Sequence, residues 1–79
     1  MKLTYDPKYN VAYIHLQDKT AQVETIHISD ELNIDIAPDG AVYGIELLEA
    51  NRRLGADRLG KLVKVNESSG QSTEVELPV

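Results

Sequence analysis

The 79-residue sequence contains no cysteine, which excludes disulfide bonds and thiolate metal sites as supports for its fold. It also contains no tryptophan and no phenylalanine, so four tyrosines are its aromatic residues. No apolar run approaches the length of a membrane span, and the first residues do not form the apolar core of a signal peptide. We therefore expect a cytoplasmic protein that is neither exported nor embedded in a membrane.

The length allows one small hydrophobic core. A chain of this size buries only about 60 to 65% of its unfolded surface, and its folding free energy should be about 4 to 12 kcal/mol. We expect a single compact β-rich domain over residues 1–65, followed by residues 66–79 as a C-terminal strand or flexible tail of the same domain. So small a core leaves little free energy to offset strained catalytic geometry.

The net charge of −5 is unevenly distributed along the sequence. Residues 1–50 carry three lysines and nine carboxylates, whereas residues 51–65 carry five basic residues and Asp57 as the one carboxylate. A single short basic segment beside an acidic region disfavours nucleic-acid and membrane partners, because neutralising phosphates needs a broad basic surface. A basic protein is the partner that this charge would attract.

Alternation of apolar and polar residues predicts five short strands. They are expected at residues 3–5, 11–17, about 22–28, 32–36 and 42–48. Tight turns should lie at 18–20 and at 37–40, where the sequence Ala-Pro-Asp-Gly favours a bulged hairpin. The predicted fold class is α+β, mostly β: an antiparallel meander of about five strands with a short helix packed on one face.

Beyond the fifth strand the apolar period becomes helical. Leu47, Ala50 and Leu54 lie at helical spacing, and Gly55 follows them as a stop signal. Residues 73–77 alternate again after a polar turn, which predicts either a C-terminal β-hairpin or a tail that becomes ordered on binding. The expected core lies on one face of the sheet and comprises Ile14, Leu16, Ile34, Ile36, Ile45 and Leu47, joined by Leu54.

Several short motifs recur in an order and spacing that suggest a known family. They are Tyr5-Asp6, Ala12-Tyr13-Ile14 with Leu16, Ile34-Asp35, Asp39-Gly40 and the run 44–50. Together they resemble the domain of unknown function 2283 family, a group of small uncharacterised bacterial and archaeal proteins. The resemblance extends from residue 1 to about residue 54 and implies no activity; residues 56–79 have no part in it, and Asn51 stands where a serine is expected.

Histidines and carboxylates on the strands are candidates for a chemical site. His15 and His27, with Glu24, Asp35 and Glu46, could meet on the solvent face of neighbouring strands, and imidazole and carboxylate groups serve as metal ligands and as acid-base catalysts. No two of them have the spacing of a recognised motif. The competing interpretation is the ordinary solvated face of a one-sided sheet.

Basic side chains near the helix are candidates for an interaction site. Arg52, Arg53 and Arg58 could contact phosphate or an acidic partner, because guanidinium groups form bidentate contacts. The alternative is that they stabilise the C-terminal end of the helix.

The sequence favours a non-catalytic protein-interaction or self-associating module without a cofactor. A small sheet with exposed edge strands associates readily, so we expect a homo-oligomer. Residues 73–79 could add to a partner's sheet, as small antitoxin-like proteins do by analogy. The second hypothesis is a small hydrolase or metal-binding domain that uses the surface histidines and carboxylates.

Overall fold

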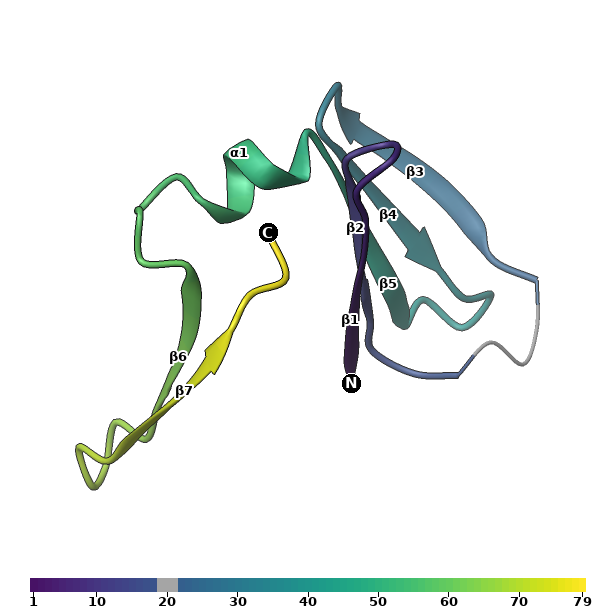
Figure 1. Ribbon diagram of the computed structural model, residues 1–79. Helices are drawn as coiled ribbons and strands as arrows, with labels where there is room; N and C mark the ends of the chain where they lie inside the picture. The colour runs from purple at the N-terminus through teal and green to yellow at the C-terminus, as the bar shows by residue number, and fades with distance from the viewer. Residues whose placement is uncertain (19–21) are drawn as a thin grey trace.

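The computed structural model describes residues 1–18 and 22–79 (Figure 1). It contains a five-stranded antiparallel sheet, one short helix and a C-terminal two-stranded hairpin, which confirms the predicted fold class. The elements are β1 (Lys2–Asp6), β2 (Val11–His15), β3 (Glu24–Ser29), β4 (Leu32–Ile36), β5 (Val42–Leu48), α1 (Ala50–Leu54), β6 (Lys61–Val65) and β7 (Ser72–Glu76).

The strand order is β1-β2-β5-β4-β3, so the sheet is not a simple meander. The expectation of consecutive neighbours fails at one connection, because β2 pairs with β5 and β3 lies at the far edge. The central strand β5 has seven residues, including the buried Tyr43, whereas every residue of the edge strand β3 is exposed. Of the turn expected at 18–20, residues 19 and 20 lie outside the described residues.

The strand register separates the side chains into two faces. Directly opposed residues point to the same side of an antiparallel sheet. On one side Ile14 pairs with Ile45, which in turn pairs with Ile34. We call this side the apolar face; it comprises Leu3, Tyr5, Ala12, Ile14, Ile26, Leu32, Ile34, Ile45 and Leu47.

The apolar face is only partly covered. Among the described residues, the buried apolar side chains are Ala12, Tyr43 and Ala50. The expected core residues Ile14, Ile34, Ile45 and Leu47 do share this face, but each keeps some exposure to solvent. Leu16 is 41% exposed and Ile26 37% exposed. The sheet therefore presents an apolar surface that α1 does not shield.

Helix α1 is anchored at the end of the sheet beside β2. It follows Glu49, whose left-handed φ of 54° turns the chain out of β5. The backbone carbonyl of Asn10 accepts a hydrogen bond from the Ala50 amide at 3.0 Å, and the Asn10 side-chain oxygen accepts one from the Asn51 amide at 2.9 Å. Asn51, which stands where a serine was expected, accepts a 2.6 Å hydrogen bond from the Asn10 amide group.

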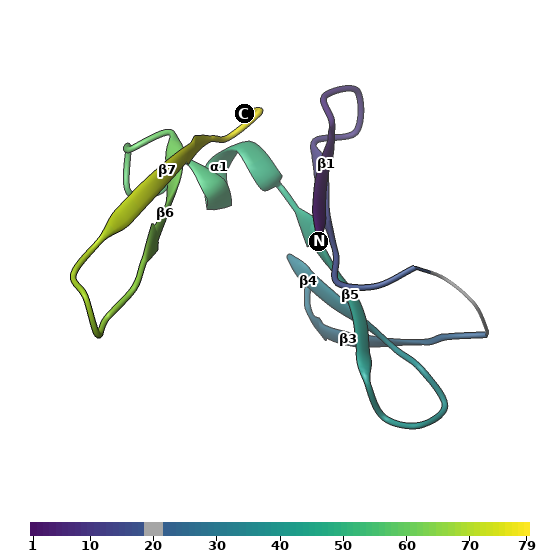
Figure 2. The same ribbon diagram turned by 90° about the horizontal axis from the view of Figure 1, so that it is seen from below.

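Strands β6 and β7 form a hairpin that stands apart from the sheet (Figures 1 and 2). In both views α1 lies between the sheet and the hairpin, which extend from it in different directions. The hairpin is one of the two C-terminal arrangements that the sequence predicts, and the division expected at residue 65 runs between its strands. The radius of gyration of 14.1 Å exceeds the value of about 12 Å for a compact chain of this length.

Candidate functional site

The side of the sheet opposite the apolar face carries a hydrogen-bonded polar network, and we call this side the polar face. At its centre the Tyr13 ring lies across Gly44, so close that a Cβ atom at Gly44 would overlap the ring. The Tyr13 hydroxyl donates a 2.5 Å hydrogen bond to Asp35, and the Thr25 hydroxyl donates one of 2.6 Å to the other carboxylate oxygen. Asp35, on β4, thus connects Tyr13 of β2, on the far side of β5, with Thr25 of the neighbouring strand β3.

Tyr13 is protonated at neutral pH. Burial, followed by the hydrogen bond to Asp35 and that residue's negative charge, raises the pKa of the Tyr13 phenol. A phenol that keeps its proton is a hydrogen-bond donor and a poor base or nucleophile. The arrangement therefore positions side chains across the sheet, and it does not activate Tyr13 for acid-base chemistry.

A second row of polar contacts crosses β3, β4 and β5. His27 Nδ1 lies 2.9 Å from the Asn33 side-chain oxygen, and the Asn33 amide donates a 2.9 Å hydrogen bond to Glu46. His27 Nε2 also lies 4.0 Å from an Asp30 carboxylate oxygen. His27 and Glu46 are thus linked through Asn33, which separates the imidazole from the carboxylate.

The structure places four of the five histidine and carboxylate candidates on the polar face without joining them in one site. His15 packs against Tyr13, with 4.4 Å between ring centroids. His15 and His27 are separated by β5 and β4, a distance of about 14 Å at three strand spacings. Glu24 is on the opposite face. No three histidine, aspartate or glutamate side chains of the described segments form a group that could hold a metal ion.

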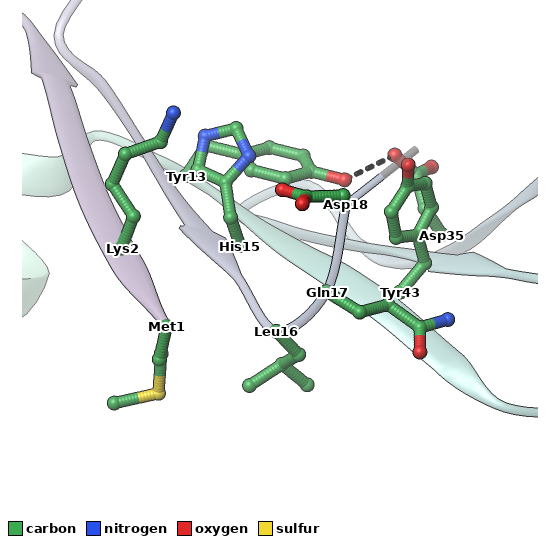
Figure 3. Close-up of a pocket in the computed structure, with 9 residues that line it drawn as sticks. All are labelled: Met1, Lys2, Tyr13, His15, Leu16, Gln17, Asp18, Asp35 and Tyr43. Carbon is green, nitrogen blue, oxygen red and sulfur yellow. Dashed lines mark hydrogen bonds between the residues drawn. The ribbon is translucent and has the colours of Figure 1, made fainter. Parts of the chain in front are cut away.

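An open cavity of about 520 Å³ lies at the end of β2 (Figure 3). The buried Tyr43 hydroxyl has no hydrogen-bond partner among the described residues. Burial, followed by the charges of Asp18 and Asp35, raises the pKa of Tyr43. The polar side chains that line this cavity can form hydrogen bonds with a small polar molecule. The sequence did not indicate Tyr43 as a site residue, because it alternates with apolar residues along its strand. The lining residues are Met1, Lys2, Tyr13, His15, Leu16, Gln17, Asp18, Asp35 and Tyr43.

Two of the three arginine candidates form ion pairs within the chain. Arg52 and Arg53 both pair with Glu31, which lies in the turn between β3 and β4; the Arg53 contact is 3.4 Å long. These pairs connect α1 to the sheet. Arg58 lies in the connection to β6 with a left-handed φ of 63° and is exposed.

The C-terminal hairpin adds a second exposed apolar surface. Leu62 of β6 pairs with Val75 of β7, and Leu77 continues the same side of the hairpin through a 3.1 Å hydrogen bond to Gly60. Leu62 is 53% exposed and Val75 is 61% exposed. The other side carries the ion pair between Lys61 and Glu74, 2.9 Å long. The chain thus exposes apolar side chains both on its sheet and on its hairpin.

The comparisons with known proteins concern the sheet. A family model described as "Protein of unknown function (DUF2283)" matches residues 2–51, which include all of the five-stranded sheet and exclude the hairpin. This match confirms the resemblance seen in the sequence motifs. No curated protein and no solved structure matches the chain. Within the described segments, no helix has both the length and the apolar character to cross a membrane.

Proposed function

The chain belongs to this family of proteins of unknown function, and from that premise we propose that it is a non-catalytic module that associates with a second copy of itself. The apolar face of the five-stranded sheet is the proposed docking surface. Its partly exposed residues come from all five strands, so the surface is continuous across the sheet. A contiguous apolar surface of this kind is characteristic of protein-protein contact sites.

The observation that carries the proposal is the amount of accessible surface. The chain exposes 6070 Å². A folded monomer of 8.8 kDa is expected to expose about 4,800 Å². The excess of about 1,300 Å² is larger than the roughly 800 Å² that each partner buries in a standard protein interface. A second copy would cover a surface that one chain leaves in water.

The contacts of the polar face argue against the hydrolase or metal-binding alternative. Asp35 accepts hydrogen bonds from Tyr13 and Thr25, and Glu46 accepts one from Asn33. These carboxylates stabilise the pairing of the strands, a role that requires no substrate. A basic protein is a second proposed partner, attracted by the nine carboxylates within residues 1–50.

Sedimentation equilibrium of the full chain over a wide concentration range tests the proposal. We expect a mass of twice 8.8 kDa that falls toward 8.8 kDa on dilution. A single mass of 8.8 kDa at every concentration would contradict self-association. Titration with zinc and manganese by calorimetry tests the alternative, because binding heat that is lost in His15→Ala would favour a metal site on the polar face.

A further inference from the structure

We propose that the occupant of the apolar face is the C-terminal hairpin of a second copy, in a reciprocal exchange in which each hairpin packs on the other copy's sheet. This inference rests on the proposed self-association and specifies its geometry. Two-fold symmetry makes the exchange self-complementary, so both apolar faces and both hairpins are covered in one closed dimer. The alternative, in which the two sheets pack against each other, would leave the hairpins uncovered.

The hairpin lacks extensive packing support within its own chain. An isolated two-stranded hairpin is at best marginally stable in water and needs packing against another element. Strands β6 and β7 make no extensive contact with the sheet, and all residues of β7 are exposed. The apolar face of the sheet and the hairpin therefore each lack an apolar surface to pack against.

The contacts of α1 hold the hairpin in a direction that leads away from its own sheet (Figure 2). Ala50 at the start of α1 is fully buried, and Asn10 forms hydrogen bonds to the backbone of Ala50 and Asn51. Glu31 holds the helix through its pairs with Arg52 and Arg53. These contacts fix α1 on the sheet, and the hairpin projects from its far end away from the chain's own strands (Figure 2). A second chain's sheet is then the natural partner for the projecting hairpin.

The hairpin and the apolar face carry one charged residue each that would complement the other. Lys64 lies on the same side of β6 as Leu62, and Glu24 lies on the same side of β3 as Ile26. Docking the apolar side of one hairpin on the other copy's apolar face would therefore bring Lys64 of one copy and Glu24 of the other into the same interface.

The apolar side of the hairpin is identified by what lies opposite it. Leu62, Val75 and Leu77 share one side, whereas the other side carries the Lys61–Glu74 ion pair and Glu76 together with Val63 and Val65. Packing the charged side against an apolar sheet would remove the ion pair from water at a cost that its attraction rarely repays. The hairpin would dock through Leu62 and Val75.

Isotope-filtered NMR on a mixture of ¹³C-labelled and unlabelled full-length chains tests this geometry, because it detects contacts between copies. We expect cross-peaks from the methyl groups of Leu62 and Val75 to those of Ile26 and Ile34. A dimer whose contacts between copies join sheet to sheet, with none from the hairpin, would overturn the exchange and leave the proposed self-association intact. A monomer at every concentration would contradict both.

A pair of matched variants supplies a second test. Leu62 and Val65 are each 53% exposed and lie on opposite sides of β6. Leu62→Ser should raise the dimer dissociation constant by at least about tenfold, since each copy loses a buried leucine at the interface. Val65→Ser should change it by less than about twofold. Equal effects of the two variants, in chains whose NMR spectra show an intact sheet, would contradict the assignment of the docking side.

Discussion

The five-stranded sheet and the C-terminal hairpin are both built from antiparallel strand pairs, yet they differ in what surrounds the strands. In the sheet, Tyr43 is 5% exposed and Asp35 accepts hydrogen bonds from two side chains on other strands. In the hairpin, Val75 is 61% exposed and the one side-chain ion pair lies in water. Correct strand pairing therefore forms in both regions, but only the sheet has tertiary contacts within the chain to stabilise it.

The largest expected contrast is between two glycines. Gly44→Ala places a methyl group where the Tyr13 ring lies, so we expect the free energy of unfolding to fall by about 3 kcal/mol, a large part of the stability of so small a domain. In Gly70→Ala, in the hairpin turn, the added Cβ atom would have no other atom within 4 Å. The free energy of unfolding should therefore fall by only about 1 kcal/mol, from the backbone strain at a φ of 76°. Urea denaturation at a fixed protein concentration measures both, and equal losses would contradict the contrast.

The next contrast is between two carboxylates. Asp35→Ala leaves the Tyr13 hydroxyl without its acceptor, so the free energy of unfolding should fall by about 2 kcal/mol. Glu74→Ala removes an exposed ion pair with Lys61 and should cost less than about 1 kcal/mol. Thermal unfolding followed by circular dichroism compares the two variants. A Glu74 variant as destabilised as the Asp35 variant would show that the hairpin carries tertiary contacts of similar strength.

High pH should destabilise the sheet selectively, because all four tyrosines lie within residues 1–50. The pKa of Tyr13 is raised above the ordinary 10.0, so above that pH the unfolded chain releases a proton that the folded chain retains. Its contribution is fully present below pH 10 and declines as pH rises further, by at most about 1.4 kcal/mol per pH unit. Urea denaturation from about pH 9 to about pH 11 should show this decline, and Tyr13→Phe should make it shallower. An unchanged slope in Tyr13→Phe would contradict the assignment.

The smallest expected effect concerns the connection between the two regions. Glu31→Gln removes the ion pairs to Arg52 and Arg53, both more than half exposed, so the loss of stability should be below about 1 kcal/mol. Hydrogen exchange should nevertheless accelerate in α1, and added salt should reduce the difference. Glu67→Gln is the control, because Glu67 forms no ion pair within the described residues. Equal exchange in both variants would show that Glu31 does not hold the helix.

Much of the fold could be predicted from local patterns. Alternation located β4 and β5 at their observed bounds, 32–36 and 42–48, because a one-sided sheet imposes a period of two. The order of the strands could not be predicted in the same way. Strand β2 pairs with β5, which contains the buried Tyr43. Which strands become neighbours depends on side-chain contacts that exist only in the assembled sheet.

The candidate site was predicted in part. Alternation placed His15 on the face opposite Ile14, and the register confirms it. The central contact of Tyr13 with Asp35 was missed, since it joins residues 22 positions apart across an intervening strand. The one local signal was Gly44, a glycine inside a strand, which indicates a close approach. The sequence did not identify the tyrosine ring as the group that approaches.

The amino-acid sequence by itself determined the mostly β character, the two faces of the sheet, the family and the acidic charge of its first fifty residues. These follow from composition and from short periodic patterns, which act between near neighbours. Tertiary structure alone decided that β5 lies beside β2, that Glu31 pairs with Arg52 and Arg53, and that the hairpin stands away from the sheet. These features depend on contacts between residues that are far apart in the sequence. Such contacts contribute free energy only when the chain is folded.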